Sequence, residues 1–212
     1  MKRGLVSVFA VIIFCFFGCK KDSNPAPSGE YLPLTDGSTW KYNYASDGGS
    51  TDTLIIKMTG GITVINNKTY YNAASTYKQG TSLGYFYAGN HLYATRTADE
   101  GFGSIELQLL NDTASVGYQW ITIPTADGTL GGSPVRTINT IKEKNITRTL
   151  NGKAFTNVIH TQVELQYNAG SGFGTSVTYD FYLAKGIGLI ENDANTVDIL
   201  HETETIFDYS IK

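Results

Sequence analysis

The sequence predicts an all-β, antiparallel domain that consists of two pseudo-repeated halves, arranged as a two-sheet sandwich or as a curved half-barrel. Three observations support this prediction: apolar and polar residues alternate with a period of two, glycine- and asparagine-rich breaks separate the alternating runs, and several landmarks recur in the same order along the chain. After the first 18 residues, no segment has the spacing of an amphipathic helix.

The first 18 residues are typical of a secretory signal. Lys2 and Arg3 precede an apolar run from Leu5 to Phe17, and Gly18 stands before Cys19. This layout predicts a bacterial lipoprotein signal over residues 1–18, cleaved so that Cys19 becomes the lipidated first residue. The apolar run is shorter than the roughly 20 residues of a membrane-spanning helix, so a permanent transmembrane anchor is the weaker alternative.

Residues 19–30 are expected to be the lipidated cysteine followed by a flexible tether. The segment Lys20–Glu30 is polar and contains two prolines, and it could extend roughly 35 Å from a bilayer. Cleavage removes two of the 16 basic residues and none of the 19 acidic ones, so the formal charge falls from −3 to −5. This balance argues against nucleic acid as a partner. Because Cys15 leaves with the leader, no disulfide or cysteine-based metal site is expected.

Residues 31–212 are predicted to form a single β domain. Trp40, Tyr42 and Tyr44 alternate with polar residues, and residues 159–167 alternate in the same way. Turn-forming residues separate these and other runs, at 47–49, 60–61, 66–67, 89–90, 131–132, 151–152 and 170–174.

Three pairs of landmarks suggest an internal duplication, with halves at about 31–110 and 111–212. Gly37-Ser-Thr-Trp40 is echoed by Gly117-Tyr-Gln-Trp120, and each tryptophan is expected to open a strand. Asn66-Asn67 and Asn151-Gly152 tolerate the positive φ angles of a type I′ turn, so both predict hairpins. Phe86-Tyr87 has a counterpart in Phe181-Tyr182.

The stretch Tyr31–Tyr42, the mid-chain Gly117-x-x-Trp120 and the stretch Tyr182–Glu191, which reads YLAKGIGLIE, together resemble uncharacterised Bacteroidetes outer-membrane lipoproteins. The resemblance implies an outer-membrane lipoprotein with an all-β domain. It provides no catalytic or ligand-binding residues.

The sequence contains no strong signature of catalysis, a metal site or a cofactor. His91, His160 and His201 are not in a metal-ligand spacing, and His160 is expected to be solvated on the polar face of its strand. Strand alternation places His201 on the opposite face from Glu202 and Glu204. No G-x-S-x-G motif is present, and the glycines at 170–174 predict a hairpin loop. We therefore expect no enzyme activity, metal or cofactor.

A group of tyrosines is the strongest candidate for ligand recognition. Alternation around the Gly89-Asn90 turn suggests that Tyr85, Tyr87 and Tyr93 share one face, opposite Phe86, Leu92 and Ala94. An exposed tyrosine row could stack on sugars or line an apolar groove. The alternative is that the rings merely stabilise the sheet through cross-strand pairing.

The sequence therefore predicts a lipid-anchored cell-envelope protein that binds a lipid, another apolar ligand or a glycan without catalysing a reaction. The alternatives are a structural or protein-interaction lipoprotein with an envelope protein partner, and a hydrolase. Lys20 after the cysteine, in place of aspartate, favours the outer membrane, with either a periplasmic or a surface-facing orientation.

Overall fold

The computed structural model describes residues 31–97 and 104–212, which contain strands and turns. The predicted signal, Cys19 and the tether lie outside the described residues. No helix in the described part is long and apolar enough to cross a membrane. The strands are β1 (Thr39–Ser46), β2 (Thr51–Ile65), β3 (Lys68–Tyr77), β4 (Gly80–Gly89), β5 (Leu92–Thr97), β6 (Glu106–Asn111), β7 (Gln119–Thr122), β8 (Thr129–Leu130), β9 (Ser133–Leu150), β10 (Lys153–Asn168), β11 (Phe173–Ala184), β12 (Gly188–Thr196) and β13 (Leu200–Ser210).

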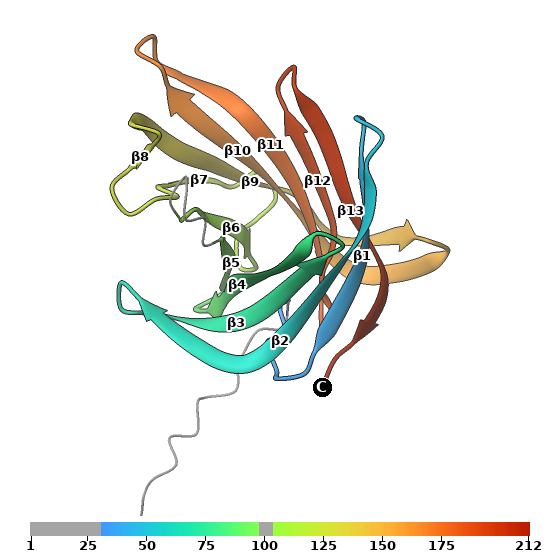
Figure 1. The fold of residues 1–212 in the computed structure, drawn as a ribbon. Helices are drawn as coiled ribbons and strands as arrows, with labels where there is room; N and C mark the ends of the chain where they lie inside the picture. Colours follow the sequence, from blue (N-terminus) through green and yellow to red (C-terminus); the bar gives the residue numbers. More distant parts are fainter. Residues whose placement is uncertain (1–30, 98–103) are drawn as a thin grey trace, which may run out of the picture.

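All the strands belong to one 13-stranded antiparallel sheet (Figure 1). Its order is β6-β5-β4-β3-β2-β1-β13-β12-β11-β10-β9-β7, and β8 pairs with β9 beside this path. The sheet curls until β6 approaches β9 and β10. Of the two predicted architectures, the structure is therefore the curved half-barrel, because a sandwich would need two separate sheets.

The two halves have the same connectivity. Strands β1 to β6 form one meander of sequential neighbours, and β7 followed by β9 to β13 forms another. The turns Asn66-Asn67 and Asn151-Gly152 each join the second and third strands of their meander, and all four residues have positive φ angles between 50° and 77°. Trp40 and Trp120 are each the second residue of a first strand. Their burial differs, because Trp40 is buried and Trp120 is only half-buried.

The predicted strand break at Gly60-Gly61 is wrong. Strand β2 continues through these residues, and its pairing with β3 shifts register between Met58 and Ile62. Gly60 has a φ of 72°, and an added Cβ would lie 2.8 Å from Cγ of Asp36. The glycine therefore permits an irregularity within a long bent strand instead of ending it.

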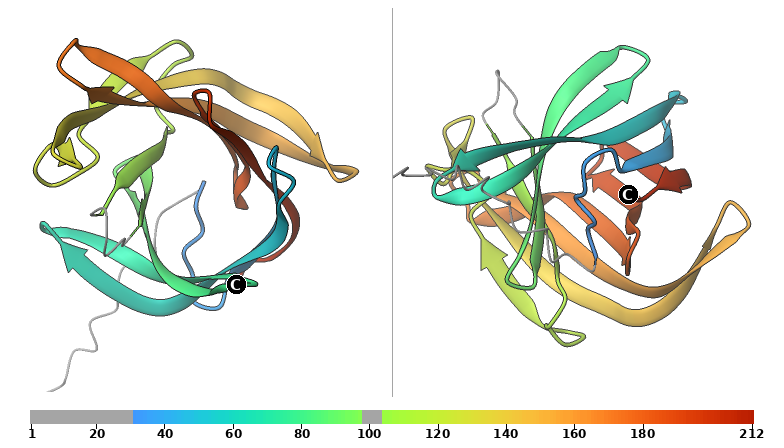
Figure 2. Two further views of the ribbon diagram at one scale, coloured as in Figure 1. Left: turned by 45° about the horizontal axis from the view of Figure 1, so that its top comes forward. Right: turned by 90° about the horizontal axis from the view of Figure 1, so that it is seen from below.

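The chain that precedes β1 runs inside the curl of the sheet (Figure 2). Tyr31, Leu32 and Leu34 are all buried there. Trp40 belongs to the same core, and its indole Nε1 donates a hydrogen bond of 2.6 Å to the carbonyl of Ile187. This N-terminal segment thus fills one end of the half-barrel. It does not fill the space inside the other end.

Candidate functional site

The concave side of the half-barrel encloses a cavity of about 320 Å³, which we call the inner cavity. This volume is near the lower end of the roughly 300–1,000 Å³ that small-molecule sites occupy. Most of the wall is apolar and comes from both halves of the chain: Leu54, Ile56, Phe86, Leu107, Leu109, Phe181 and Leu189. The polar side chains of Tyr77, Asn192 and Glu204 also line it.

Small residues on β3 and β4 explain why this space is not filled. Ser75 pairs in register with Ser82, and Ala73 pairs with Gly84. Directly opposed residues on neighbouring strands project to the same face, so these pairs place short side chains next to one another. A wall without large side chains leaves room inside the curl.

The N-terminal segment forms the floor of the inner cavity. Leu32, Leu34 and Trp40 line a gap of only about 20 Å³, which shares Ile56 and Phe86 with the cavity above it. The space is therefore closed on the side of this segment.

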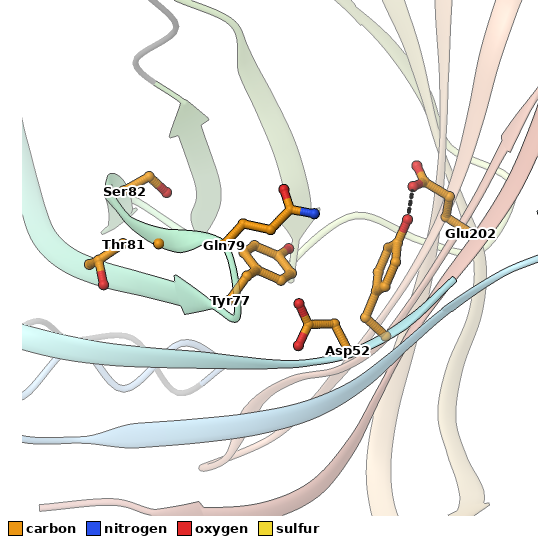
Figure 3. A pocket seen from close by; sticks show the side chains of 8 residues that line it. Asp52, Tyr77, Gln79, Thr81, Ser82 and Glu202 are labelled. Carbon is orange, nitrogen blue, oxygen red and sulfur yellow. Dashed lines mark hydrogen bonds between the residues drawn. The ribbon is translucent and has the colours of Figure 1, made fainter. Parts of the chain in front are cut away.

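The open end is a wider depression of about 490 Å³, which we call the mouth (Figure 3). It shares Tyr77 and Ser82 with the inner cavity. Asp52 and Glu202 supply carboxylates to the mouth. The Tyr44 hydroxyl donates a hydrogen bond to Glu202, and the Tyr44 ring meets the Tyr77 ring edge-on at 6.2 Å.

Glu204 is the most deeply placed acid of the site. Its Oε1 accepts a hydrogen bond of 3.0 Å from the Tyr77 hydroxyl, and its Oε2 accepts one of 3.2 Å from Nδ2 of Asn192, its register partner on β12. Burial raises the pKa of Glu204, and the two hydrogen bonds partly oppose this rise. Burial also raises the pKa of Tyr77, as does the charge of Glu204. The polar end of the cavity is therefore a linked set of a phenol, a carboxyl and an amide.

The structure divides the three tyrosines of the predicted recognition row. Tyr85 and Tyr87 are half-buried on the convex face, where Nζ of Lys68 lies 4.0 Å from the centre of the Tyr87 ring. Tyr93 is buried, donates a hydrogen bond of 2.8 Å to Asp112 and meets Tyr31 edge-on. None of the three lines the inner cavity.

The prediction that these three tyrosines share a face is wrong, and the turn explains the error. Asn90 and His91 both have positive φ and form a two-residue turn between Gly89 and Leu92. Tyr93 therefore opposes Ala88, and Tyr87 opposes Ala94. A two-residue turn pairs odd-numbered with even-numbered residues, so Tyr93 lies on the face of Phe86 instead of the face of Tyr87.

The expectation of a solvated His160 is also wrong, since only 8% of this residue is exposed. Its ring stacks on Tyr182 at 4.2 Å. Nε2 lies 2.6 Å from Oδ1 of Asp180, and Nδ1 lies 3.2 Å from Oε2 of Glu143. Neighbouring strands thus cover a histidine that looked exposed from its own strand alone.

Within residues 31–97 and 104–212, no group of three or more His, Cys, Asp or Glu side chains is arranged to hold a metal ion. The polar residues of the candidate site that the sequence did not single out are Tyr77, Asn192 and Glu204. One available signal was that Glu202 and Glu204 share a strand face, but the sequence did not show that this face is concave.

No family model matches the chain, and no curated protein matches it either. Two solved structures are similar. One is assigned as a lipoprotein from Parabacteroides distasonis, with a TM-score of 0.53 and 11% identity over 86% of this chain and 99% of the other. The second is assigned as an exported protein with a YmcC-like fold from Bacteroides fragilis, with a TM-score of 0.52 and 8% identity over the same shares. At such low identity the likeness concerns the fold alone.

Proposed function

We propose that this protein is a lipid-anchored envelope lipoprotein that binds a small apolar ligand in its inner cavity without chemical conversion. The observation that carries the proposal is the mainly apolar wall of the cavity, to which both halves of the chain contribute. Apolar surface that a ligand can cover is the main source of affinity in such pockets.

The envelope location rests on the signal layout before Cys19 and on the resemblance to Bacteroidetes lipoproteins. The two similar folds, assigned as a lipoprotein and as an exported protein, support it. An apolar ligand is favoured over a glycan, because the exposed row of three tyrosines needed for sugar stacking does not form and the cavity wall is aliphatic and aromatic.

The test fills the cavity. Ser75→Phe adds a ring to the inner face of β3, and Thr76→Phe adds the same ring to the opposite face of that strand. The protein would begin at residue 19 with Cys19→Ser, which retains the whole described domain. Binding would be followed by the fluorescence of N-phenyl-1-naphthylamine, whose emission rises in apolar surroundings.

We expect the Cys19→Ser protein and its Thr76→Phe variant to bind the dye with the same affinity. The Ser75→Phe variant should bind it at least tenfold more weakly, and its circular dichroism spectrum should show that it is still folded. Equal binding by both phenylalanine variants would show that the dye does not occupy the inner cavity. It would favour the alternative of a structural or protein-interaction lipoprotein.

A further inference from the structure

The polar end of the inner cavity offers hydrogen-bond acceptors to a ligand. The Tyr77 hydroxyl and Nδ2 of Asn192 already donate to the two oxygens of Glu204. These donors occupy one acceptor direction on each oxygen, and a carboxylate has about four such directions in total. Glu204 can therefore accept further hydrogen bonds from a group inside the cavity.

A second, independent feature is the amide oxygen of Asn192. This Oδ1 is buried and has no hydrogen-bond partner within the described part of the chain. Buried acceptors are usually paired, and one that lines a cavity can be satisfied by a donor on a ligand. Glu204 and Asn192 are register partners on β13 and β12, so their free acceptors lie on the same wall.

No cationic side chain neutralises this end of the cavity. Among the described residues, Glu204 and Glu202 form no ion pair. Lys78 is largely exposed, and its Nζ lies 4.0 Å from Oδ1 of Asp52. Burial of an acid without a cation is reflected in the raised pKa of Glu204.

Arg96 also borders the inner cavity, and its Nε is buried without a hydrogen-bond partner among the described residues. It pairs in register with Glu106, and its charge lowers the pKa of Tyr70, whose hydroxyl bonds to the same glutamate. Its charge therefore acts on Tyr70, and no cation, Arg96 included, is among the causes that shift the pKa of Glu204.

We propose that the ligand is an aliphatic amine, with its apolar chain in the inner cavity and its ammonium group against Glu204 and Asn192. This inference rests on the proposed function and adds the class of ligand. An ammonium has three donors, no acceptor and a positive charge, so it matches a site of unpaired acceptors beside an unneutralised acid. A carboxylate head group would bring an acceptor and a negative charge to the same place.

The experiment compares three probes of equal chain length: decylamine, decanol and decanoate. Each would displace N-phenyl-1-naphthylamine from the same Cys19→Ser protein at neutral pH. We expect half-displacement by decylamine at a concentration at least tenfold below that of decanoate, with decanol between them. This comparison needs no variant in the site and is therefore independent of any effect on folding.

Glu204→Gln then tests the residue itself. Glutamine keeps an oxygen for the Tyr77 hydroxyl but removes the charge. The concentration of decylamine needed for half-displacement should therefore rise about tenfold and equal that of decanol. Asp198→Asn is the matched control. It removes one negative charge at an exposed turn with a φ of 57°, which asparagine adopts readily, and it should leave the preference for decylamine unchanged.

The outcomes separate the two proposals. Equal displacement by all three probes would overturn the amine inference and leave apolar binding intact. Stronger displacement by decanoate would also overturn it and would point to Arg96 as the head-group partner. Failure of all three probes to displace the dye, or failure of the dye to bind, would overturn the proposed function together with the inference.

Discussion

At the scale of single residues, Glu204 shows how the fold creates an unusual environment from ordinary strand residues. The same alternation that brings Glu202 to the mouth places Glu204 two positions deeper on the same face. Solvent hydrates the outer acid, whereas Tyr77 and Asn192 are the only polar partners that the described residues provide for the inner one. The position of each glutamate along β13 therefore determines whether water or protein groups surround its carboxyl.

The raised pKa of Glu204 predicts how its contribution to stability depends on pH. Its ordinary value is 4.5, and the folded state holds the proton more tightly. Below 4.5 the side chain is protonated in both states, and the contribution is fully present. As pH rises from 4.5 through the higher folded pKa, the folded state binds more protons than the unfolded state, so stability falls.

Glu204→Gln should remove this component, at about 1.4 kcal/mol for each unit by which the folded pKa is raised. The measurement is the free energy of unfolding from urea titrations of both proteins between about pH 4 and pH 8. The difference between them isolates Glu204, since the other acids are common to both. A difference that stays constant with pH would contradict the prediction.

At the scale of elements, two-residue turns set which side chains can cooperate. The turns at 66–67, 90–91 and 151–152 all consist of residues with positive φ. Each turn fixes the register of its hairpin, and a shift of one residue would reverse the faces. The turn predicted at Gly89-Asn90 lies one residue later, at Asn90-His91. The error over Tyr93 arose because a two-residue turn pairs odd-numbered with even-numbered residues, and this pairing was not followed through.

The Asn151-Gly152 turn provides a test of this role of the backbone. Gly152 has a φ of 77°, and an added Cβ would meet no atom within 4 Å. Gly152→Val should therefore destabilise the protein by about 1–2 kcal/mol through backbone conformation alone. Thermal unfolding would measure this loss.

Gly174→Val is the control for that experiment. Gly174 also has open space around it, but its φ is not in the left-handed region, and it lies within β11. Valine is favourable in a strand, so this variant should be neutral or slightly stabilising. Equal losses at both positions would mean that the size of valine, and not the φ angle, is responsible.

At the scale of the whole molecule, the two ends of the half-barrel differ. Gly80, at the start of β4, lines the mouth, whereas Gly89, at its end, lies beside Tyr31, the first described residue. A strand of this length spans about 30 Å. Tyr31, the residue that follows the predicted tether, thus lies at the end of the half-barrel opposite the mouth.

Cys19→Ser should therefore abolish lipid attachment without affecting the inner cavity. We expect mass spectrometry of the native protein to find a lipid mass on Cys19, and the serine variant to remain an unlipidated precursor. Dye binding should be the same for the lipidated protein and for the variant made from residue 19. An unmodified Cys19 on a mature chain would contradict the lipoprotein prediction.

The sequence by itself determined the all-β class, the hairpin turns and the order of landmarks in two related halves. These features depend on local chemistry: alternation selects strands, and Asn-Asn and Asn-Gly pairs select hairpin turns, whereas the glycine pair at 60–61 lies within β2. The lipoprotein prediction likewise rests on the sequence, because the leader and Cys19 lie outside the described residues.

Only the tertiary structure decided between sandwich and half-barrel, and only it located the inner cavity. Curling brings β3 and β4 opposite β11, β12 and β13, so Tyr77 meets a glutamate that is 127 positions away in the chain. Both faces of these strands carry aromatic and polar residues, so alternation alone could not show which face is concave. The space exists because serine, alanine and glycine on one wall face larger side chains on another, and only the curled sheet brings these walls together.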